Sequence, residues 1–331
     1  MPPRLLRSAL TTATIVCALM MVVRPTPVQA WNERGHMLVA FIAYQHLNVT
    51  AKKNVATLLK RNPQYNTWIQ GLPANASEER RTLSAFIHAA NWPDFIKSAE
   101  GYVADGPNGG NTPPPGPEAS QNIGYADKNQ HRYWHFINVA FSDDGTPTED
   151  PPSVNARSAI GRMRTALASA STSDEIKSYD LTWLIHLVGD LHQPLHAVAR
   201  FTHADRDGDK GGNDVALKCN ATLQCPENLH SLWDGLLGVN VSPAQIAATG
   251  AKLDTGSVSS GANGIDVNVW IQESLELART NAYRTVSGKP LGDPTATLDK
   301  AYLDRARAIA RERVVLAGRR LAMLTNEALG K

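Results

Sequence analysis

The segment HLVGDLHQPLH, residues 186–196, places three histidines and an aspartate inside an apolar run. Buried polar groups cost several kcal/mol each unless they are paired or bind something. His186 and Asp190 are four residues apart, so on a helix they would share one face with Cβ atoms about 5–6 Å apart. Pro194 would kink or end that helix and turn His196 elsewhere. This spacing suits a metal ion, or an aspartate that bridges two, but it is also typical of a core histidine paired with an aspartate.

Other parts of the chain repeat this donor chemistry. His230 and Asp234 in NLHSLWDG have the same spacing, His135 lies between two aromatic residues in YWHFIN, and Asp94 follows a Trp-Pro pair. All ten histidines fall between residues 36 and 230. The pattern predicts a multinuclear His/Asp metal centre. Histidine nitrogen and carboxylate oxygen suit zinc best, with manganese and iron as alternatives.

The first thirty residues have the features of a signal peptide. Arg4 and Arg7 precede an apolar run of about fifteen residues, and Val28-Gln29-Ala30 fits the small-x-small cleavage rule. A membrane anchor is the alternative, but a span needs roughly 20 apolar residues. We therefore expect cleavage after Ala30, export to the periplasm or the medium, and a mature chain of residues 31–331 without stable membrane association.

Cleavage would give the mature chain an unusual first residue. Trp31 would carry a free α-amine, whose pKa of about 7.7–8.0 allows it to lose its proton to a metal. The amine and carbonyl oxygen of one residue can form a five-membered chelate. His36 follows five residues later, so we expect the new terminus to lie near the metal centre.

Charge and cysteine content restrict the function further. Removing residues 1–30 takes away three arginines and no acid, which changes the formal net charge from +2 to −1. That balance excludes a protein that holds nucleic acid by charge alone. Cys17 leaves with the signal peptide. Cys219 and Cys225 remain, and in an exported chain they are predicted to form one local disulfide.

Helical periodicity dominates the mature chain and predicts an all-α fold with one mainly helical domain. The expected helices cover residues 36–47, 50–61, 155–171, 179–192, 242–253, 267–286 and 297–329. The best strand signal, NDVALKC at residues 213–219, predicts at most a short β-hairpin closed by the cysteine pair. Residues 101–130 are rich in Gly and Pro, and we expect a long surface loop rather than an interdomain linker.

The ordered donor series resembles that of the S1/P1 nuclease family, which comprises zinc-dependent single-strand nucleases and 3′-nucleotidases with a phospholipase C-type fold. The resemblance covers essentially the whole mature chain. It implies three Zn²⁺ per chain. One zinc would be held by Asp94, His135 and His186, and a second by Trp31 and His36, with Asp190 bridging the two; His196, His230 and Asp234 would hold a third, more open zinc.

The resemblance also implies an activity. A hydroxide between the two zincs that Asp190 joins would attack the phosphodiester phosphorus, with Asp94, Lys97 and Asp190 as the catalytic residues. Single-stranded DNA and RNA would be cut to 5′-phosphate products, nucleotides would lose 3′-phosphate, and the enzyme would act as a monomer.

Four residues match the substrate-binding positions of the family: Lys97, Phe136, Asn138 and Asn213. Lys97 stands where members usually carry Arg, which would weaken the phosphate contact. Phe136 would stack on a base, although it could be a core residue. Asn138 replaces an Asp found in several members, so the base preference is left open. Asn213 in GGND would donate to phosphate, or simply cap a loop.

Two other functions fit part of the pattern. A zinc-dependent phospholipase C resembles the chain in fold, N-terminal Trp and ligand order, but it uses a His…Glu pair where this chain has NLHSLWDG. A metal-storage protein is the non-enzymatic alternative. Serine hydrolase and metalloprotease functions are not supported, because G-x-S-x-G and H-E-x-x-H are both absent.

Overall fold

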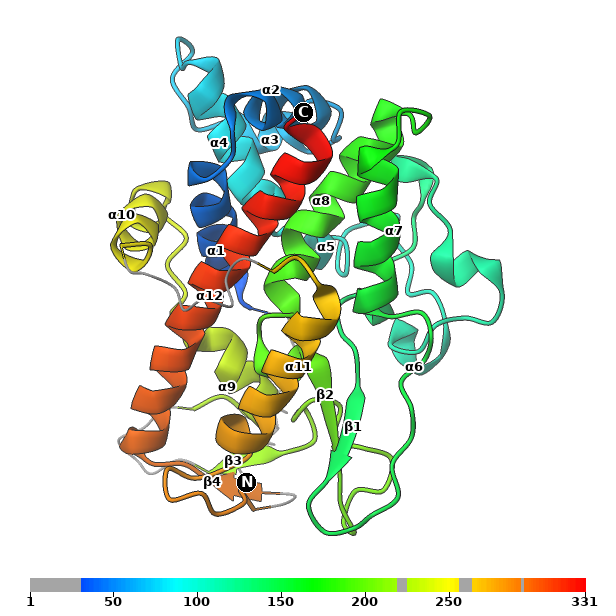
Figure 1. Ribbon diagram of the computed structural model, residues 1–331, viewed down its shortest axis with the longest axis vertical. Coiled ribbons are helices and arrows are strands. Elements are labelled where there is room, and N and C mark those ends of the chain that lie inside the picture. The colour runs from blue at the N-terminus through cyan, green and yellow to red at the C-terminus, as the bar shows by residue number, and fades with distance from the viewer. Residues whose placement is uncertain (1–30, 219–224, 256–263, 293–294) are drawn as a thin grey trace, which may run out of the picture.

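Three helices form the centre of the molecule in the computed structural model, which describes residues 31–218, 225–255, 264–292 and 295–331. They are α1 (Glu33–Gln45), α8 (Asp174–Asp190) and α12 (Lys300–Leu329), and α7 (Ala156–Ala168) packs along α8 (Figure 1). Every residue of α8 from 178 to 190 is buried. A helix that is apolar on all sides is stable only inside a core, which explains the apolar run around the first histidines.

Shorter elements surround this centre. The other α-helices are α2 (Val49–Leu59), α3 (Tyr65–Ile69), α4 (Glu78–Ala89), α5 (Trp92–Phe95), α6 (Pro107–Gly110), α9 (Leu229–Gly235), α10 (Pro243–Leu253) and α11 (Val267–Leu277). The 3₁₀ turns are η1 (Pro117–Ser120), η2 (Gly124–Ala126), η3 (Arg132–Trp134) and η4 (Pro194–Ala197), and a π-turn, η6 (Ala278–Ala282), follows α11. The expectation of a mainly helical fold is confirmed.

Side-chain caps explain where several helices begin. The side-chain oxygen of Asn32 accepts from the Gly35 N–H at the start of α1, Ser173 accepts from the Ile176 N–H at α8, and Asp299 accepts from the Tyr302 N–H at α12. Each cap satisfies one of the free amide donors of a helix start. These caps fix the register of the three central helices, two of which carry predicted metal ligands.

The strands pair differently from the hairpin expected at residues 213–219. β1 (Val139–Ser142) runs parallel to β2 (Val198–Phe201), and β3 (Ala216–Lys218) runs parallel to β4 (Thr295–Thr297). In the described part of this segment, the antiparallel pairing expected of a hairpin is limited to the Ala216–Asn228 bridge. The partner of β3 comes late in the chain, so no local turn signal could reveal it. Cys219 lies outside the described residues, and its pairing with Cys225 stays a prediction, as does the signal peptide at residues 1–30.

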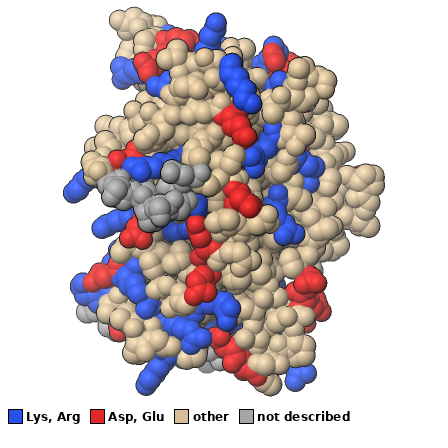
Figure 2. All heavy atoms as spheres, in the orientation of Figure 1, with Lys and Arg blue, Asp and Glu red and all other residues tan. Residues whose placement is uncertain are grey.

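The surface is mixed in charge. Figure 2 shows Asp and Glu side chains scattered among Lys and Arg on the face over α11 and α12, in keeping with a net charge near zero. In the described part of the chain, no helix combines the length and apolar character that crossing a membrane requires.

Packing of α1 against α12 leads to a test with two Gly→Ala changes. A Cβ on Gly318 in α12 would lie 2.7 Å from Ile42 Cβ in α1, whereas a Cβ on Gly161 in α7 would meet nothing within 4 Å. We expect Gly318→Ala to lower the free energy of unfolding by about 1–3 kcal/mol through overpacking. Gly161→Ala should raise it by about 0.5–1 kcal/mol through helix propensity. Urea titrations measure both, and equal effects of the two changes would contradict this packing.

Candidate metal centre

The predicted ligands with described side-chain donors come from six separate parts of the fold and meet in three groups. His36 lies on α1, Asp94 on α5, His135 directly after η3, His186 and Asp190 on α8, His196 on η4, and His230 and Asp234 on α9. The groups are His36–His186–Asp190, Asp94–His135–His186 and His196–His230–Asp234, and within each group the donor atoms lie within 4.8 Å of one another. All eight side chains are buried.

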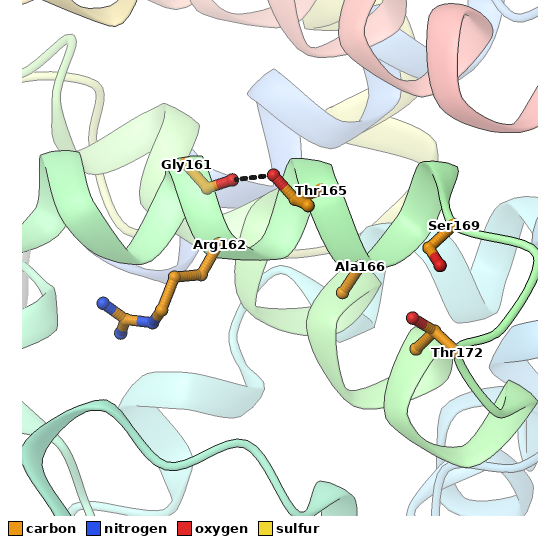
Figure 3. A pocket seen from close by; sticks show the side chains of 6 residues that line it. All are labelled: Gly161, Arg162, Thr165, Ala166, Ser169 and Thr172. Carbon is orange, nitrogen blue, oxygen red and sulfur yellow. Dashed lines mark hydrogen bonds between the residues drawn. The ribbon is translucent and has the colours of Figure 1, made fainter. Parts of the chain in front are cut away.

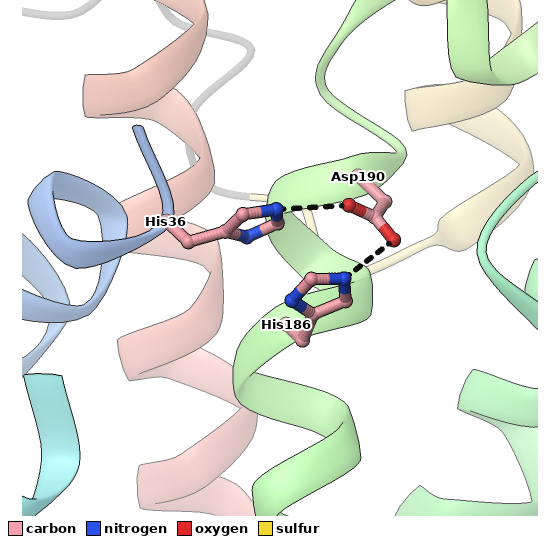
Figure 4. Close-up of side chains that lie close together, drawn as sticks. All are labelled: His36, His186 and Asp190. Atoms are coloured by element: carbon pink, nitrogen blue, oxygen red, sulfur yellow. Dashed lines mark ion pairs between the residues drawn. The ribbon is translucent and has the colours of Figure 1, made fainter. Parts of the chain in front are cut away.

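Asp190 stands between two sets of donors. Its Oδ1 lies 3.2 Å from His36 Nε2, and its Oδ2 lies 3.2 Å from His186 Nε2, as Figure 4 shows. The same Oδ2 is 3.0 Å from His135 Nδ1. Asp94 Oδ1 completes this side, 3.8 Å from His135 Nδ1 and 3.7 Å from His186 Nε2. The two oxygens of Asp190 therefore face different groups.

Backbone carbonyls determine which ring nitrogens are free to bind a cation. The Nδ1–H of His196 donates to the His135 carbonyl at 2.9 Å, and that of His230 donates to the Gly211 carbonyl at 2.7 Å. A carbonyl can only accept, so in each neutral ring Nε2 carries the lone pair. The two Nε2 atoms lie 3.0 Å apart. Lone pairs at this distance repel each other unless a cation lies between them.

Several donor atoms of the site have no hydrogen-bond partner among the described residues. They are His36 Nδ1, His135 Nε2 and Asp234 Oδ2, together with His36 Nε2 and Asp190 Oδ1, which face each other at 3.2 Å without the geometry of a hydrogen bond. A buried polar atom left unsatisfied costs about 1–3 kcal/mol. Free nitrogen and carboxylate donors converging in buried groups of three are the ligand chemistry of zinc sites. The residues present therefore fit metal ions.

Burial keeps several of the histidines in the form that binds metal; His186 is the exception, because Asp190 and Asp94 outweigh burial and raise its pKa. Burial lowers the pKa of His36 to about 4, and it lowers the pKa values of His135 and His230 to about 3, helped by Lys97 for His135 and by His196 for His230. Burial opposes ionisation of Asp94, but Lys97 and the nearby histidines outweigh it and bring its pKa to about 2. At neutral pH these groups offer lone pairs and negative charge rather than protons.

Sequence reasoning missed Gln193, which orients a predicted ligand. Its Nε2 donates to Asp234 Oδ1 at 2.7 Å, and its Oε1 accepts from the Leu195 N–H at 2.6 Å. Gln193 is fully buried. Asp234 Oδ2 is thereby left to face His230 Nε2 at 3.5 Å. A glutamine directly before a proline carries no recognisable signal by itself.

The histidine next to it, His192, supports the chain rather than joining a donor group. Its Nδ1–H donates to the Val188 carbonyl at 2.7 Å, and its Nε2 lies 2.9 Å from an Arg320 guanidinium nitrogen. Arg320 in turn pairs with Glu273 at 2.7 Å. This network fastens the turn between Asp190 and His196 to α11 and α12.

His131 is a second supporting histidine that the sequence did not reveal. Its ring nitrogens lie 2.9 Å from Asp105 and 2.9 Å from Asp127, and its ring stacks on Trp134 with centroids 3.7 Å apart. Burial would lower the pKa of His131, but hydrogen bonds to the two carboxylates outweigh it and raise the pKa. The network holds the segment that leads into His135.

Lys97 and Asn213, the two residues predicted to contact phosphate, are held in different ways. Lys97 is nearly buried, and its Nζ donates to Asp94 Oδ1 at 2.7 Å, so it is not a solvated surface lysine. Asn213 Nδ2 donates to the Lys210 carbonyl at 2.7 Å. The adjacent Gly211 has φ +64°, and a Cβ there would lie 2.2 Å from the Leu195 carbonyl oxygen. Position 211 therefore requires glycine, because any side chain would collide with Leu195. The carbonyl of Gly211 itself accepts the hydrogen bond from His230.

The aromatic segment after η3 divides into core and surface. Trp134 is buried and its Nε1 donates to the Ala119 carbonyl at 3.0 Å, so it is a core residue. Phe136 and Asn138 are partly exposed. Phe136 packs against the core while remaining partly exposed.

Asn32, the residue after Trp31, ties the start of the described chain to the helix that carries His230 and Asp234. The side chain of Trp31 is fully buried, and the N–H of Asn32 donates to the Asp234 carbonyl at 3.1 Å. Asn32 Nδ2 also donates to the Gly238 carbonyl at 2.6 Å. The segment entering α1 is therefore tied to the end of α9.

A hollow elsewhere on the surface has different chemistry. It lies on α7 and is lined by Gly161, Arg162, Thr165, Ala166, Ser169 and Thr172 (Figure 3). None of the predicted ligands lines it. The hydroxyl of Thr165 donates to the Gly161 carbonyl of its own helix, so this hollow offers no comparable set of free donors.

Fold and site together define a mainly helical protein with three buried His/Asp groups that could hold metal ions. The family model described as S1/P1 Nuclease matches residues 31–330, and the chain belongs to this metal-dependent family. It is accordingly a hydrolase that cleaves phosphodiester bonds.

Three relatives with nuclease names are similar to this chain. Endonuclease 4 of Arabidopsis thaliana is 26% identical over 321 residues, which cover 89% of this chain and 88% of the relative. Endonuclease 5 of the same plant is 30% identical over 51% of this chain and 58% of its own length. Nuclease S1 of Aspergillus oryzae is 26% identical over 43% of this chain and 51% of its own length.

The role of Gln193 can be tested by metal content. Gln193→Leu removes the donor that orients Asp234, and loss of such outer contacts typically weakens metal affinity 10- to 100-fold. We expect the zinc-loaded variant to lose part of its metal, the share held by the His196–His230–Asp234 group, at a lower chelator concentration than the parent. Elemental analysis after dialysis against graded chelator measures this. Gln70→Leu, at an exposed position, is the control, and identical zinc retention in both variants would contradict the role.

Proposed function

We propose that residues 31–331 form an exported, zinc-dependent endonuclease that cuts single-stranded DNA and RNA to 5′-phosphate products and also removes 3′-phosphate from nucleotides. The observation that carries this proposal is the convergence of three buried His/Asp groups in a chain of the S1/P1 nuclease family. The names of the relatives, Endonuclease 4 and Nuclease S1, point the same way.

The proposed metal content is three Zn²⁺ per chain. Asp94, His135 and His186 would hold one ion, and Trp31 and His36 a second, with Asp190 shared between them; His196, His230 and Asp234 would hold the third. The two oxygens of Asp190, which face His36 and His186 separately, support the shared role. When bound, clustered zinc ions lower the pKa of coordinated water towards neutrality and neutralise phosphate oxygens.

The chain's own residues would position the phosphate. Lys97, held by Asp94 at 2.7 Å, brings a fixed positive charge to the edge of the donor groups. It offers a point charge rather than the two-pronged contact of an arginine. Asn213 has two amide N–H groups, of which one donates to Lys210. The other is available to a phosphate oxygen.

Recognition of the base would rest on Phe136 and Asn138. An aromatic ring next to His135 can stack on any base, since every base has a π-face. Bases inside a duplex are already stacked on each other and cannot reach such a ring, which gives a physical reason for single-strand preference. The Asn138 amide can both donate and accept, so it would contact bases of more than one type.

Export and the mature terminus belong to the same proposal. Cleavage after Ala30 would free the α-amine of Trp31, and the Asn32–Asp234 hydrogen bond supports its position near the donor groups. A Cys219–Cys225 disulfide would fit an oxidising compartment, either the periplasm or the medium.

The proposal is tested by offering the mature, zinc-loaded chain four substrates: heat-denatured DNA, the same DNA as duplex, RNA and phosphatidylcholine. We expect chelator-sensitive cleavage of denatured DNA and RNA, with 5′-phosphate ends, and much slower cleavage of the duplex. Asp190→Asn should lower turnover at least about 100-fold because removing one interaction made with the reacting group costs several kcal/mol. Asp180→Asn, at another buried aspartate of α8, is the matched control.

Two results would contradict the proposal. Cleavage of phosphatidylcholine with intact DNA would indicate a phospholipase C. Near-native turnover of Asp190→Asn would show that Asp190 joins no groups that matter for catalysis.

A further inference from the structure

Phe95 is unusual among the aromatic residues of this protein. Its side chain is 48% exposed, while every other Phe, Tyr and Trp in the described residues is buried or only partly exposed. An exposed phenyl ring presents apolar surface to water at a cost in free energy. Single exposed apolar side chains are common on protein surfaces, so the case for Phe95 rests on its position next to Asp94.

The position of Phe95 relates it to the metal centre. It follows Asp94 directly, just as Phe136 follows His135. Asp94 Oδ1 and His135 Nδ1 lie 3.8 Å apart and belong to one donor group. Consecutive Cα atoms are 3.8 Å apart, so the backbone of each phenylalanine lies one residue from a donor of this group.

The backbone that carries the two rings is firmly held. The N–H of Phe95 donates to the Asn91 carbonyl at 3.0 Å within the turn of α5. Two residues on, the Lys97 carbonyl accepts from Gln130 Nε2 at 3.1 Å and from an Arg132 guanidinium nitrogen at 3.2 Å. The segment with Phe95 is therefore fastened to the segment that leads into His135 and Phe136.

We propose that Phe95 is a second base-stacking residue, which takes the base on the opposite side of the cleaved phosphate from the base on Phe136. The inference rests on the proposed single-strand nuclease function and deepens it. Lys97, two residues beyond Phe95, holds its ammonium group against Asp94, so a phosphate on Lys97 would be bound by the same short segment that carries the ring. The preferred substrate is then at least an unpaired dinucleotide, with one base on each phenylalanine.

Three dinucleotides test this arrangement with the zinc-loaded mature chain: thymidylyl-thymidine and two analogues that lack the first or the second base. Stacking on an aromatic ring accounts for about 5- to 150-fold in binding per base. We expect Phe95→Ala to raise the KM for the complete dinucleotide by such a factor, with little change in kcat. For one of the two analogues, the variant and the parent should have the same KM.

Matched variants separate stacking from other effects. Phe95→Trp keeps an aromatic face and should retain the parental KM. Ile123→Ala removes another exposed apolar side chain, 52% exposed, and should change nothing. An unchanged KM for Phe95→Ala, or an equal rise for all three dinucleotides, would overturn the role of Phe95 while leaving the nuclease function standing. Failure of the parent to cut any of the three would overturn both.

Discussion

The carboxylate of Asp190 is the constraint on which the rest of the site depends. It lies at the end of a helix buried on all sides, with one oxygen towards His36 and the other towards His135 and His186. A charged group in such a place is tolerated only when opposite charge or hydrogen bonds surround it. Burial lowers the pKa values of His36 and His135, whereas Asp190 and Asp94 raise that of His186 against burial, so beyond a proton on His186 positive charge has to come from a bound ion. The fold thus creates a demand for cations at this point.

Hydrogen bonds from the neighbouring structure hold the side chains of the three donor groups in their orientations. Gln193 and the carbonyls of Ala90, His135 and Gly211 orient side chains of the three donor groups through single hydrogen bonds. Farther out, a buried cluster around Arg320 and the network of His131 fix the two irregular segments that carry His196 and His135. Irregular backbone is more mobile than helix. These polar networks therefore hold the two segments in place, as helical hydrogen bonds would in a helix.

The sequence predicted those parts of the site whose residues lie close together in the chain, and missed those that depend on contacts between distant residues. Spacings of four residues on α8 and α9 predicted two ligand pairs, because both ligands of each pair lie within one helical turn. Asp94 and His135 have no partner donor nearby in the sequence, so they could be predicted as ligands only from the ordered series of donors along the whole chain. Gln193 and His131 could not be found in this way, since each acts through one long-range contact that leaves no local pattern. The same reason explains why β3 was expected in a hairpin and instead pairs in parallel with β4.

The central claim is that the three donor groups hold metal ions and that Asp190 is shared by two of them. The most direct measurement is an anomalous difference map from crystals of the mature, zinc-loaded protein, collected at energies on both sides of the zinc absorption edge. The account predicts three zinc peaks, two of them separated by the Asp190 carboxylate with one oxygen directed at each. A single peak, or an Asp190 carboxylate that contacts only one ion, would contradict it.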